Sequence, residues 1–245
     1  MIWIPDDKMK KPGLAIQPLQ VQATGTTGDS TDALRLAQIE AGDFDDWLQR
    51  ILQSFRTASA MEVPCGDCRG CCSAGRFVHL VPSDQQARAA ISRDFLQHAP
   101  GMPSGHAVVG YLADGLCPML KHGTCTIYPY RPSTCRTFDC RVLAAAGLQV
   151  VGKWNERINA RVQAWRFTFS SSDSWARFNA IRRAADFIGH NAAAFPGGRA
   201  PSEPATIAVL AIKVHPVLMG TNRHAKPSDV ANAIVAASRR FEETC

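Results

Sequence analysis

The sequence predicts a small α+β protein in which a cysteine-rich lobe with short strands is flanked by helices. Short strand-like segments separated by polar turns occupy the middle of the chain, and apolar residues at helical spacing occur on both sides. Eight of the nine cysteines also fall in the middle. We divide the chain into four parts: a flexible N-terminal arm over 1–30, a helical segment over 31–59, a cysteine-cluster domain over 60–142 and a mainly helical region over 143–245.

Length and composition limit the class of protein. A chain of 245 residues with 46% apolar and 20% charged residues can bury a core without crosslinks. No apolar run approaches the length of a membrane span, so we expect no membrane partner. The net charge of +6 falls short of a nucleic-acid footprint, so we expect no nucleic-acid partner, and a protein partner is left open. The opening "MIWIPDDKMKKPG" has two aspartates where a signal peptide would be basic and no apolar stretch behind them, which favours a cytoplasmic location.

The first elements follow from residue periodicity. The Gly- and Thr-rich stretch that ends the arm has none. From Asp43 onward, apolar residues recur at helical spacing, which predicts an amphipathic helix through Phe55. After the first cysteines, "RFVHLVP" alternates like a short strand, and Ser83 is the expected N-cap of a helix over 84–99.

The sequence then predicts a hairpin followed by helices. The segments "GYLADGLCPML" and "CTIYPY" have the pattern of two strands joined by the turn "KHGT", with one cysteine on each arm. We expect helices over 153–167, 173–190 and 228–243. The stretch "ATIAVLAIKVHPVLM" is apolar enough to be buried, and its pattern does not decide between strand and helix.

The cysteines are the strongest functional signal in the chain. In a reducing compartment, clustered thiols indicate metal ligands or catalytic groups before disulfides. Successive C-x-x-C spacings, with Gly66 and Gly70 easing the turns, suit thiolates that point at one metal. A ladder of three such thiols with a remote fourth also holds a 4Fe–4S cluster. The candidate metal ligands are Cys65, Cys68, Cys71, Cys72, Cys117, Cys125, Cys135 and Cys140.

The adjacent pair Cys71 and Cys72 bears on the number of sites. Neighbouring side chains usually diverge, so we expect one of the two thiols to face a second site formed with the later cysteines. Eight thiols allow two four-ligand sites, or one cluster with the remaining thiols structural or redox-active. A disulfide framework would need an oxidising compartment. We expect His79 and His122 not to be ligands and Cys245 to take no part.

Residues near the ligands are expected to offset the charge of the thiolates. Pro132 favours a short helix that presents Cys135 near its positive end. Cys140 would lie about 140° around such a helix from Cys135, so the helix must break between them if both bind one centre. Tyr128, Tyr130 and Phe138 are expected either to shield the site or to pack in the core. The arginines within a few residues of ligands are Arg69, Arg76, Arg131, Arg136 and Arg141.

The sequence "CGDCRGCC" followed by "CPMLKHGTCTIYPYRPSTCRTFDC" resembles the YkgJ-type cysteine-cluster family, whose members are described as zinc- or iron-chelating proteins. The resemblance covers residues 60–142, and its most specific piece is C-x-I-Y-x-x-R-P-x-x-C-R, which runs from Cys125 to Arg136. It implies that the clustered cysteines bind metal and that the domain over 60–142 is a metal-binding domain. A similar cysteine pattern occurs in flagellin lysine methylase, an iron–sulfur enzyme that uses S-adenosylmethionine.

Three hypotheses follow. The first is a cytoplasmic protein that chelates iron, as an iron–sulfur cluster, or zinc, with any further activity undefined. The cluster is favoured over zinc because its separate iron corners use the third thiol of the ladder. The second is an iron–sulfur-dependent protein lysine methyltransferase, although the sequence has no glycine-rich methyl-donor loop. The third is a zinc-stabilised adaptor or nucleic-acid module. The sequence does not decide whether the protein is an enzyme.

Overall fold

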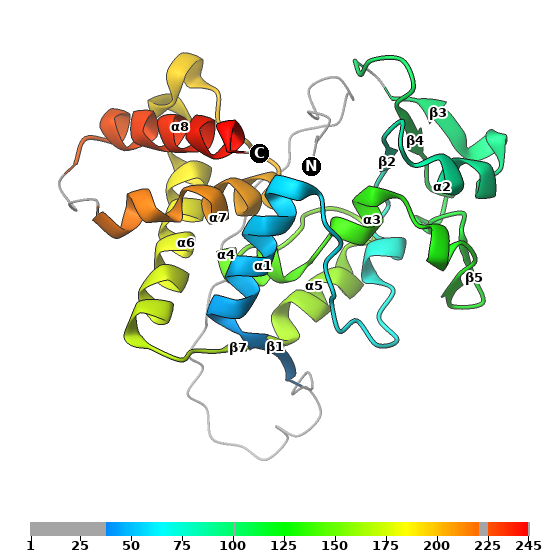
Figure 1. The fold of residues 1–245 in the computed structure, drawn as a ribbon, viewed down its shortest axis with the longest axis horizontal. Helices are drawn as coiled ribbons and strands as arrows, with labels where there is room; N and C mark the ends of the chain where they lie inside the picture. Colours follow the sequence, from blue (N-terminus) through cyan, green and yellow to red (C-terminus); the bar gives the residue numbers. More distant parts are fainter. Residues whose placement is uncertain (1–37, 100, 221–224, 245) are drawn as a thin grey trace. The chain divides into compact units, whose positions relative to one another are not determined.

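Figure 1 shows a computed structural model of the chain, which describes residues 38–99, 101–220 and 225–244. The described residues form an α+β protein of helices and short strands, which confirms the predicted class. The predicted arm over 1–30 and Cys245 lie outside the described residues. Two compact units divide the chain. The first unit contains Arg50–Asp139 and Gly152–Asn159, and the remaining described residues make up the second.

A three-stranded antiparallel sheet forms the centre of the first unit. Its order is β2 (Val78–Leu80), β4 (Ala107–Val109) and β3 (Leu96–His98). Val109 lies opposite the first residue of each outer strand. The strand predicted from "RFVHLVP" is therefore confirmed as β2. The buried apolar residues around this sheet are Leu80, Ala87, Ile91, Ala107, Val109 and Ile127.

The helix predicted over 84–99 is wrong beyond its first turns. Helix α2 spans Gln85–Ala90, and its N-cap is Asp84 rather than Ser83. At Ile91 the backbone becomes extended, with ψ at 130°, and the Ile91 side chain is buried. A 3-10 turn and strand β3 then complete the stretch that was expected to be helical. Pairing with β4, which is distant in sequence, is the interaction that overrides the local helical pattern.

The predicted hairpin is confirmed, although its strands are short. Strand β5 (Leu120–Lys121) pairs with β6 (Thr124–Cys125), and Gly123 in the turn has φ at +74°. The residues expected to extend the second arm form the 3-10 turn η4 (Tyr128–Tyr130) instead. Helix α3 follows over Ser133–Thr137, as the proline before it predicts.

The second unit begins with β1 (Ile39–Asp43), which pairs in parallel with β7 (Trp165–Thr168). Between Glu40 and Gly42 the register shifts at a bulge, where Gly42 has φ at +90°. The helix predicted over 153–167 is therefore wrong in its last residues, which belong to β7. An aromatic cluster packs beside this strand pair, and its rings are those of Phe44, Trp47, Phe167, Phe169 and Phe178.

The helices of the second unit pack on the apolar helix α7 (Pro204–Gly220), which contacts α4, α6 and α8 (Figure 1). The stretch "ATIAVLAIKVHPVLM" is thus a helix, and it carries Pro216 within it. Helices α6 and α8 confirm the predictions over 173–190 and 228–243. Helices α1 and α5 run across the boundary between the units. The bounds are α1 Phe44–Thr57, α4 Arg141–Ala146, α5 Glu156–Ala164, α6 Ser172–His190 and α8 Pro227–Glu243.

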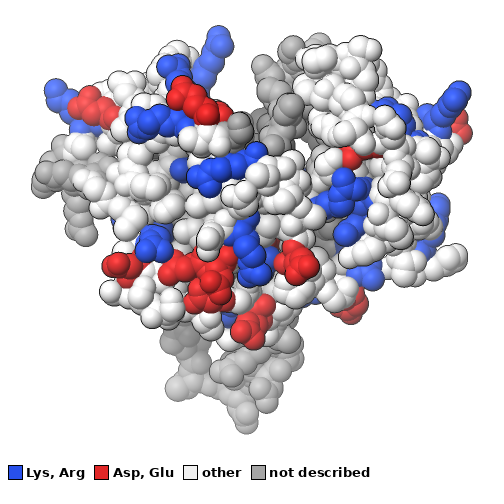
Figure 2. Space-filling model, in the orientation of Figure 1, with Lys and Arg blue, Asp and Glu red and all other residues white. Residues whose placement is uncertain are grey.

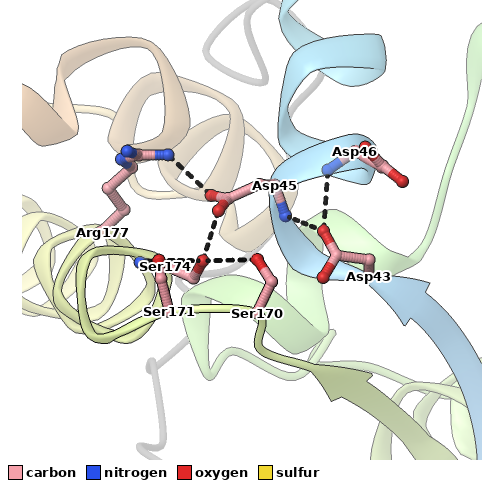
Figure 3. Close-up of polar contacts among 7 residues, drawn as sticks. All are labelled: Asp43, Asp45, Asp46, Ser170, Ser171, Ser174 and Arg177. Carbon is pink, nitrogen blue, oxygen red and sulfur yellow. Dashed lines mark hydrogen bonds and ion pairs between the residues drawn. The ribbon is translucent and has the colours of Figure 1, made fainter.

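Polar side chains at the start of α1 and α6 fix these two helices to each other (Figure 3). Asp43 Oδ1 accepts the backbone N–H groups of the first turn of α1, at 2.9 and 3.1 Å, and so caps the helix. The Asp45 carboxylate accepts hydrogen bonds from Ser174 and from Arg177 Nη1, the latter at 2.7 Å. Ser171 caps α6 through a bond from the Ser174 N–H at 3.1 Å. The bonds of this network join residues of the second unit, which indicates a structural role.

The surface carries charges of both signs. On the face drawn in Figure 2, Lys and Arg side chains are interspersed with Asp and Glu. Among the helices that the structure describes, none combines the length and the apolarity needed to cross a bilayer.

Candidate metal centre

Seven of the eight predicted ligands belong to the first unit, where three separate segments carry them. The first segment is the loop from Cys65 to Cys72, which ends in the 3-10 turn η2 (Gly70–Ser73). The second leads through Cys117 into the hairpin, and the third is helix α3. The remaining ligands of these segments are Cys68, Cys71, Cys125 and Cys135.

The first C-x-x-C forms a tight turn. The Cys68 N–H donates to the Cys65 carbonyl at 2.9 Å, and Gly66 within the turn has φ at +54°. The N–H of Gly70 then donates to the Cys68 sulfur at 3.4 Å. Such N–H groups stabilise a sulfur that carries negative charge. The turn therefore has the backbone arrangement that the spacing predicts for a metal-binding loop.

Backbone hydrogen bonds hold the first cysteine loop against the second. The Cys117 N–H donates to the Cys72 carbonyl at 2.8 Å, and the Gly75 N–H donates to the Gly115 carbonyl at 3.1 Å. Arg69 Nε donates to the carbonyl of Gly123 at 2.6 Å, which ties the loop to the hairpin turn. These contacts bring residues forty or more positions apart in sequence next to each other.

Helix α3 is anchored by a buried carboxylate on the sheet side of the unit. Asp84, which is 4% exposed, accepts hydrogen bonds from the Ser133 N–H at 2.9 Å and from the Ser133 hydroxyl. Thr134 Oγ1 donates to the carbonyl of His79 in β2 at 2.8 Å. Because Cys135 is the next residue, these bonds fix the position from which its thiol approaches the loops.

The two adjacent thiols affect each other's titration. Interaction with the Cys72 side chain lowers the pKa of Cys71 to about 7, although burial acts in the opposite direction. The same interaction raises the pKa of Cys72, and burial and the neighbouring thiols add to the effect. The expectation that Cys71 and Cys72 face different sites stays a prediction, and the structure adds that the two thiols interact with each other.

Five thiols from the three segments lie close enough to affect one another. Burial raises the pKa of Cys117, and the charges of Cys125 and Cys71 raise it further. Burial raises the pKa of Cys135 to about 12, with contributions from Cys71, Cys117 and Cys125. Since Cys72 also interacts with Cys117 and Cys135, the five form a single electrostatic group. We call Cys71, Cys72, Cys117, Cys125 and Cys135 the thiol group.

A basic side chain and a phenol complete the surroundings of the thiol group. The Arg131 guanidinium lowers the pKa of both Cys71 and Cys135 by its charge. Tyr111 donates its hydroxyl hydrogen to the Cys71 carbonyl at 3.2 Å. Burial raises the pKa of Tyr111, and the nearby thiols raise it further. The sequence analysis missed Tyr111, because nothing in the local pattern marks it.

The other aromatic and histidine expectations have mixed outcomes. Tyr128 and Tyr130 are 59% and 48% exposed, so they do not pack in the core, and a shielding role stays a prediction. The Arg131 guanidinium lies 3.6 Å from the centre of the Tyr128 ring. His79 Nε2 pairs with His106 Nδ1 at 2.9 Å, and the two rings stack. His122 occupies the hairpin turn with φ at +49°.

Cys140 belongs to the second unit. It precedes α4, is 8% exposed, and its sulfur accepts a hydrogen bond from Trp165 Nε1 at 3.2 Å. Between it and α3 the backbone becomes extended at Phe138, with ψ at 125°, so the helix does break between Cys135 and Cys140. A role for Cys140 as a ligand stays a prediction.

The side chains of the thiol group are of the type that binds thiophilic metals, but they are not arranged around one point. Thiolates are the ligands of zinc and of iron–sulfur clusters, and a bound cation relieves their mutual repulsion. Among the described residues, no three Cys, His, Asp or Glu side chains are already placed around one point as metal ligands.

Half-exposed thiols gathered from three segments, with a guanidinium beside them, are the donor set of a metal-chelating protein. Residues 64–158 match the model of the CxxCxxCC family, whose description is "Putative zinc- or iron-chelating domain". These residues are therefore similar to the zinc- or iron-chelating domain of this family, and the resemblance seen in the sequence is confirmed over them. The match continues past residue 142 to residue 158. Comparisons with curated proteins and with solved structures gave no match.

Proposed function

We propose that the protein chelates iron, in the form of an iron–sulfur cluster, through its clustered cysteines, with zinc as the alternative occupant. The observation that carries the proposal is the convergence of five cysteines from three segments into the thiol group. Thiols that raise one another's pKa stay protonated without a metal, and a cation bound between them would favour the thiolate form. The match to a zinc- or iron-chelating domain supports the same conclusion.

The number of thiols favours the cluster over a lone zinc ion. A structural zinc site uses four ligands, whereas the thiol group has five members, and Cys65 and Cys68 lie in the same loop. An iron–sulfur cluster offers separate iron corners to thiols that arrive from different directions. The exposure of Cys71 leaves one side of the group open to an incoming metal.

The surrounding residues have defined tasks in this proposal. Arg131 offsets the negative charge that several thiolates leave on a bound centre. The N–H of Gly70 stabilises the charge on the Cys68 sulfur, and the hydroxyl of Tyr111 fixes the carbonyl of Cys71. We place the protein in the cytoplasm, where a reducing environment keeps thiols available for metal.

The test is the composition of protein purified without air from cells supplied with iron. We expect iron and acid-labile sulfide in equal amounts, together with broad absorption near about 400 nm from thiolate-bound iron. Protein that contains zinc but neither iron nor sulfide would support zinc, rather than an iron–sulfur cluster, as the bound metal. Protein that binds S-adenosylmethionine in equilibrium dialysis would support the methyltransferase hypothesis. Protein that holds no metal under these conditions would contradict chelation.

A further inference from the structure

The segment Gly152–Asn159 packs on both cysteine loops of the first unit, although it carries no cysteine itself. A Cβ atom built on Gly115 would lie 2.5 Å from Trp154 Cγ, and one built on Gly75 would lie 2.9 Å from Trp154 Cζ3. At the other end of the segment, a Cβ atom on Gly70 would lie 2.9 Å from the Ile158 Cα. The indole therefore sits directly on the backbone of two glycines, with no room for a side chain beneath it.

The backbone conformations show that this packing is specific. Gly75 and Gly115 have φ at +60° and +83°, and Trp154 itself has φ at +73°. A bulky residue rarely adopts a left-handed conformation, and it does so only where its surroundings hold it there. The indole is nevertheless 39% exposed, so burial in a core does not explain the strain.

The two glycines under the indole belong to the hydrogen-bonded pair of cysteine loops. The Gly75 N–H to Gly115 carbonyl bond, at 3.1 Å, lies next to the bond from Cys117 to Cys72, at 2.8 Å. The ring thus covers the place where the two loops meet. Parting of the loops would separate Cys72 from Cys117, and it would require the indole to leave both glycines.

We propose that Trp154 is a positioning residue that holds the Cys72 loop against the Cys117 loop and thereby controls how long the site retains its metal. The inference rests on the proposed function, since retention has meaning only if the thiol group binds metal. Residues that support metal ligands from outside the coordination sphere alter affinity by about 10- to 100-fold. Trp154 acts in this way through the backbone of both loops.

The experiment compares zinc-loaded wild-type protein with Trp154→Ala, Trp154→Phe and Trp175→Ala in a release assay with a chromogenic chelator. Trp175 is the matched control because it is 52% exposed and belongs to the second unit. We expect release from Trp154→Ala to be about 10- to 100-fold faster than from wild type. Trp154→Phe keeps a ring over the glycines and should restore most of the retention, and Trp175→Ala should behave as wild type.

Cobalt substitution supplies a spectroscopic measure of ligand number. The charge-transfer absorption of Co²⁺ bound by thiolates should be weaker in Trp154→Ala than in wild type and should recover in Trp154→Phe. Release rates and cobalt spectra that are the same in Trp154→Ala and Trp175→Ala would overturn the proposal.

A second variant keeps the test decisive if Trp154→Ala fails to fold. Gly115→Ala adds a methyl group that pushes against the indole, and Gly42→Ala is its control, because Gly42 has a similar φ of +90° with no atom within 4 Å of the added Cβ. We expect faster release from Gly115→Ala alone. Equal release from both would show that backbone strain, and not the indole contact, governs retention.

Amide hydrogen exchange separates this proposal from the function on which it rests. If wild-type protein binds neither zinc nor cobalt, the chelation proposal fails. The amides of Gly75 and Cys117 still test Trp154 in the metal-free reduced protein. Their exchange should be faster in Trp154→Ala than in Trp175→Ala. Equal protection in the two variants would overturn the positioning role.

Discussion

Replacing Asp84 by alanine should release helix α3, which carries Cys135, from the sheet of the first unit. Asp84 is 4% exposed, and its carboxylate accepts two hydrogen bonds from Ser133 and one from the Val81 N–H at 3.0 Å. The variant leaves all three donors without this acceptor. The contact with Arg136 Nη2, at 3.7 Å and half-exposed, adds little.

The expected magnitude follows from the two Ser133 bonds. A hydrogen bond to a charged group contributes about 1.5 to 3 kcal/mol. Ser133 is half-buried, so water replaces part of each lost bond and the low end of that range applies. Two bonds at the low end give roughly 3 kcal/mol for the free energy of opening α3, which corresponds to about 100-fold.

Amide hydrogen exchange in the metal-free reduced protein measures this opening. We expect the amide of Arg136, which donates to the Pro132 carbonyl at 3.1 Å, to exchange about 100-fold faster in Asp84→Ala. Asp84→Asn keeps an acceptor without the charge and should show a smaller increase. Asp94→Ala is the control, because Asp94 is exposed and accepts one 3.3 Å bond from Ser92. A change below about threefold in Asp84→Ala would refute the anchoring role.

Two further predictions concern stability. Burial and the neighbouring His106 lower the pKa of His79 in the folded protein. As the pH falls below about 6.5, His79 therefore binds a proton more readily in the unfolded chain than in the folded one, which lowers the free energy of unfolding. Wild-type protein should therefore lose more stability than His79→Gln between about pH 7.5 and 5.5 in urea titrations, and equal losses would contradict this. Trp47 is fully buried with its ring centre 4.8 Å from that of Phe167, so Trp47→Ala should lower the free energy of unfolding by about 3 to 5 kcal/mol. Trp175→Ala, at a half-exposed ring, should cost much less, and a similar loss in both variants in calorimetry would count against the described core.

Local sequence patterns were sufficient to predict the elements that are determined by residues within or next to them. The apolar spacing from Phe44 predicted α1, and Pro132 predicted the start of α3. The turn glycine at position 123 marked the hairpin between Cys117 and Cys125. In each case the determinant lies within a few residues of the element that it sets.

Long-range contacts account for the predictions that were wrong. The helix expected over 84–99 ends because β3 pairs with β4, and the helix expected to reach residue 167 ends because β7 pairs with β1. No periodicity within either segment records its partner strand.

The candidate site divides in the same way. Spacing selected the cysteines as candidates, whereas the interaction of Cys71 with Cys72 was not predicted, and the place of Tyr111 depends on a contact across forty residues. Trp154 lies still further along the chain. No sequence pattern marks Trp154. Only the structure explains why positions 75 and 115 are glycines, because the indole leaves no room for a side chain at either position.

Metal content measured on wild-type protein, Cys135→Ser and Cys245→Ser tests most directly the claim that the clustered thiols hold a metal. All three proteins would be purified without air from iron-supplied cells and analysed for iron, zinc and sulfide per chain. Cys135 interacts with all four other members of the thiol group, so its loss should remove most of the metal. Cys245→Ser should retain the wild-type amount. Equal metal in all three proteins would contradict the account.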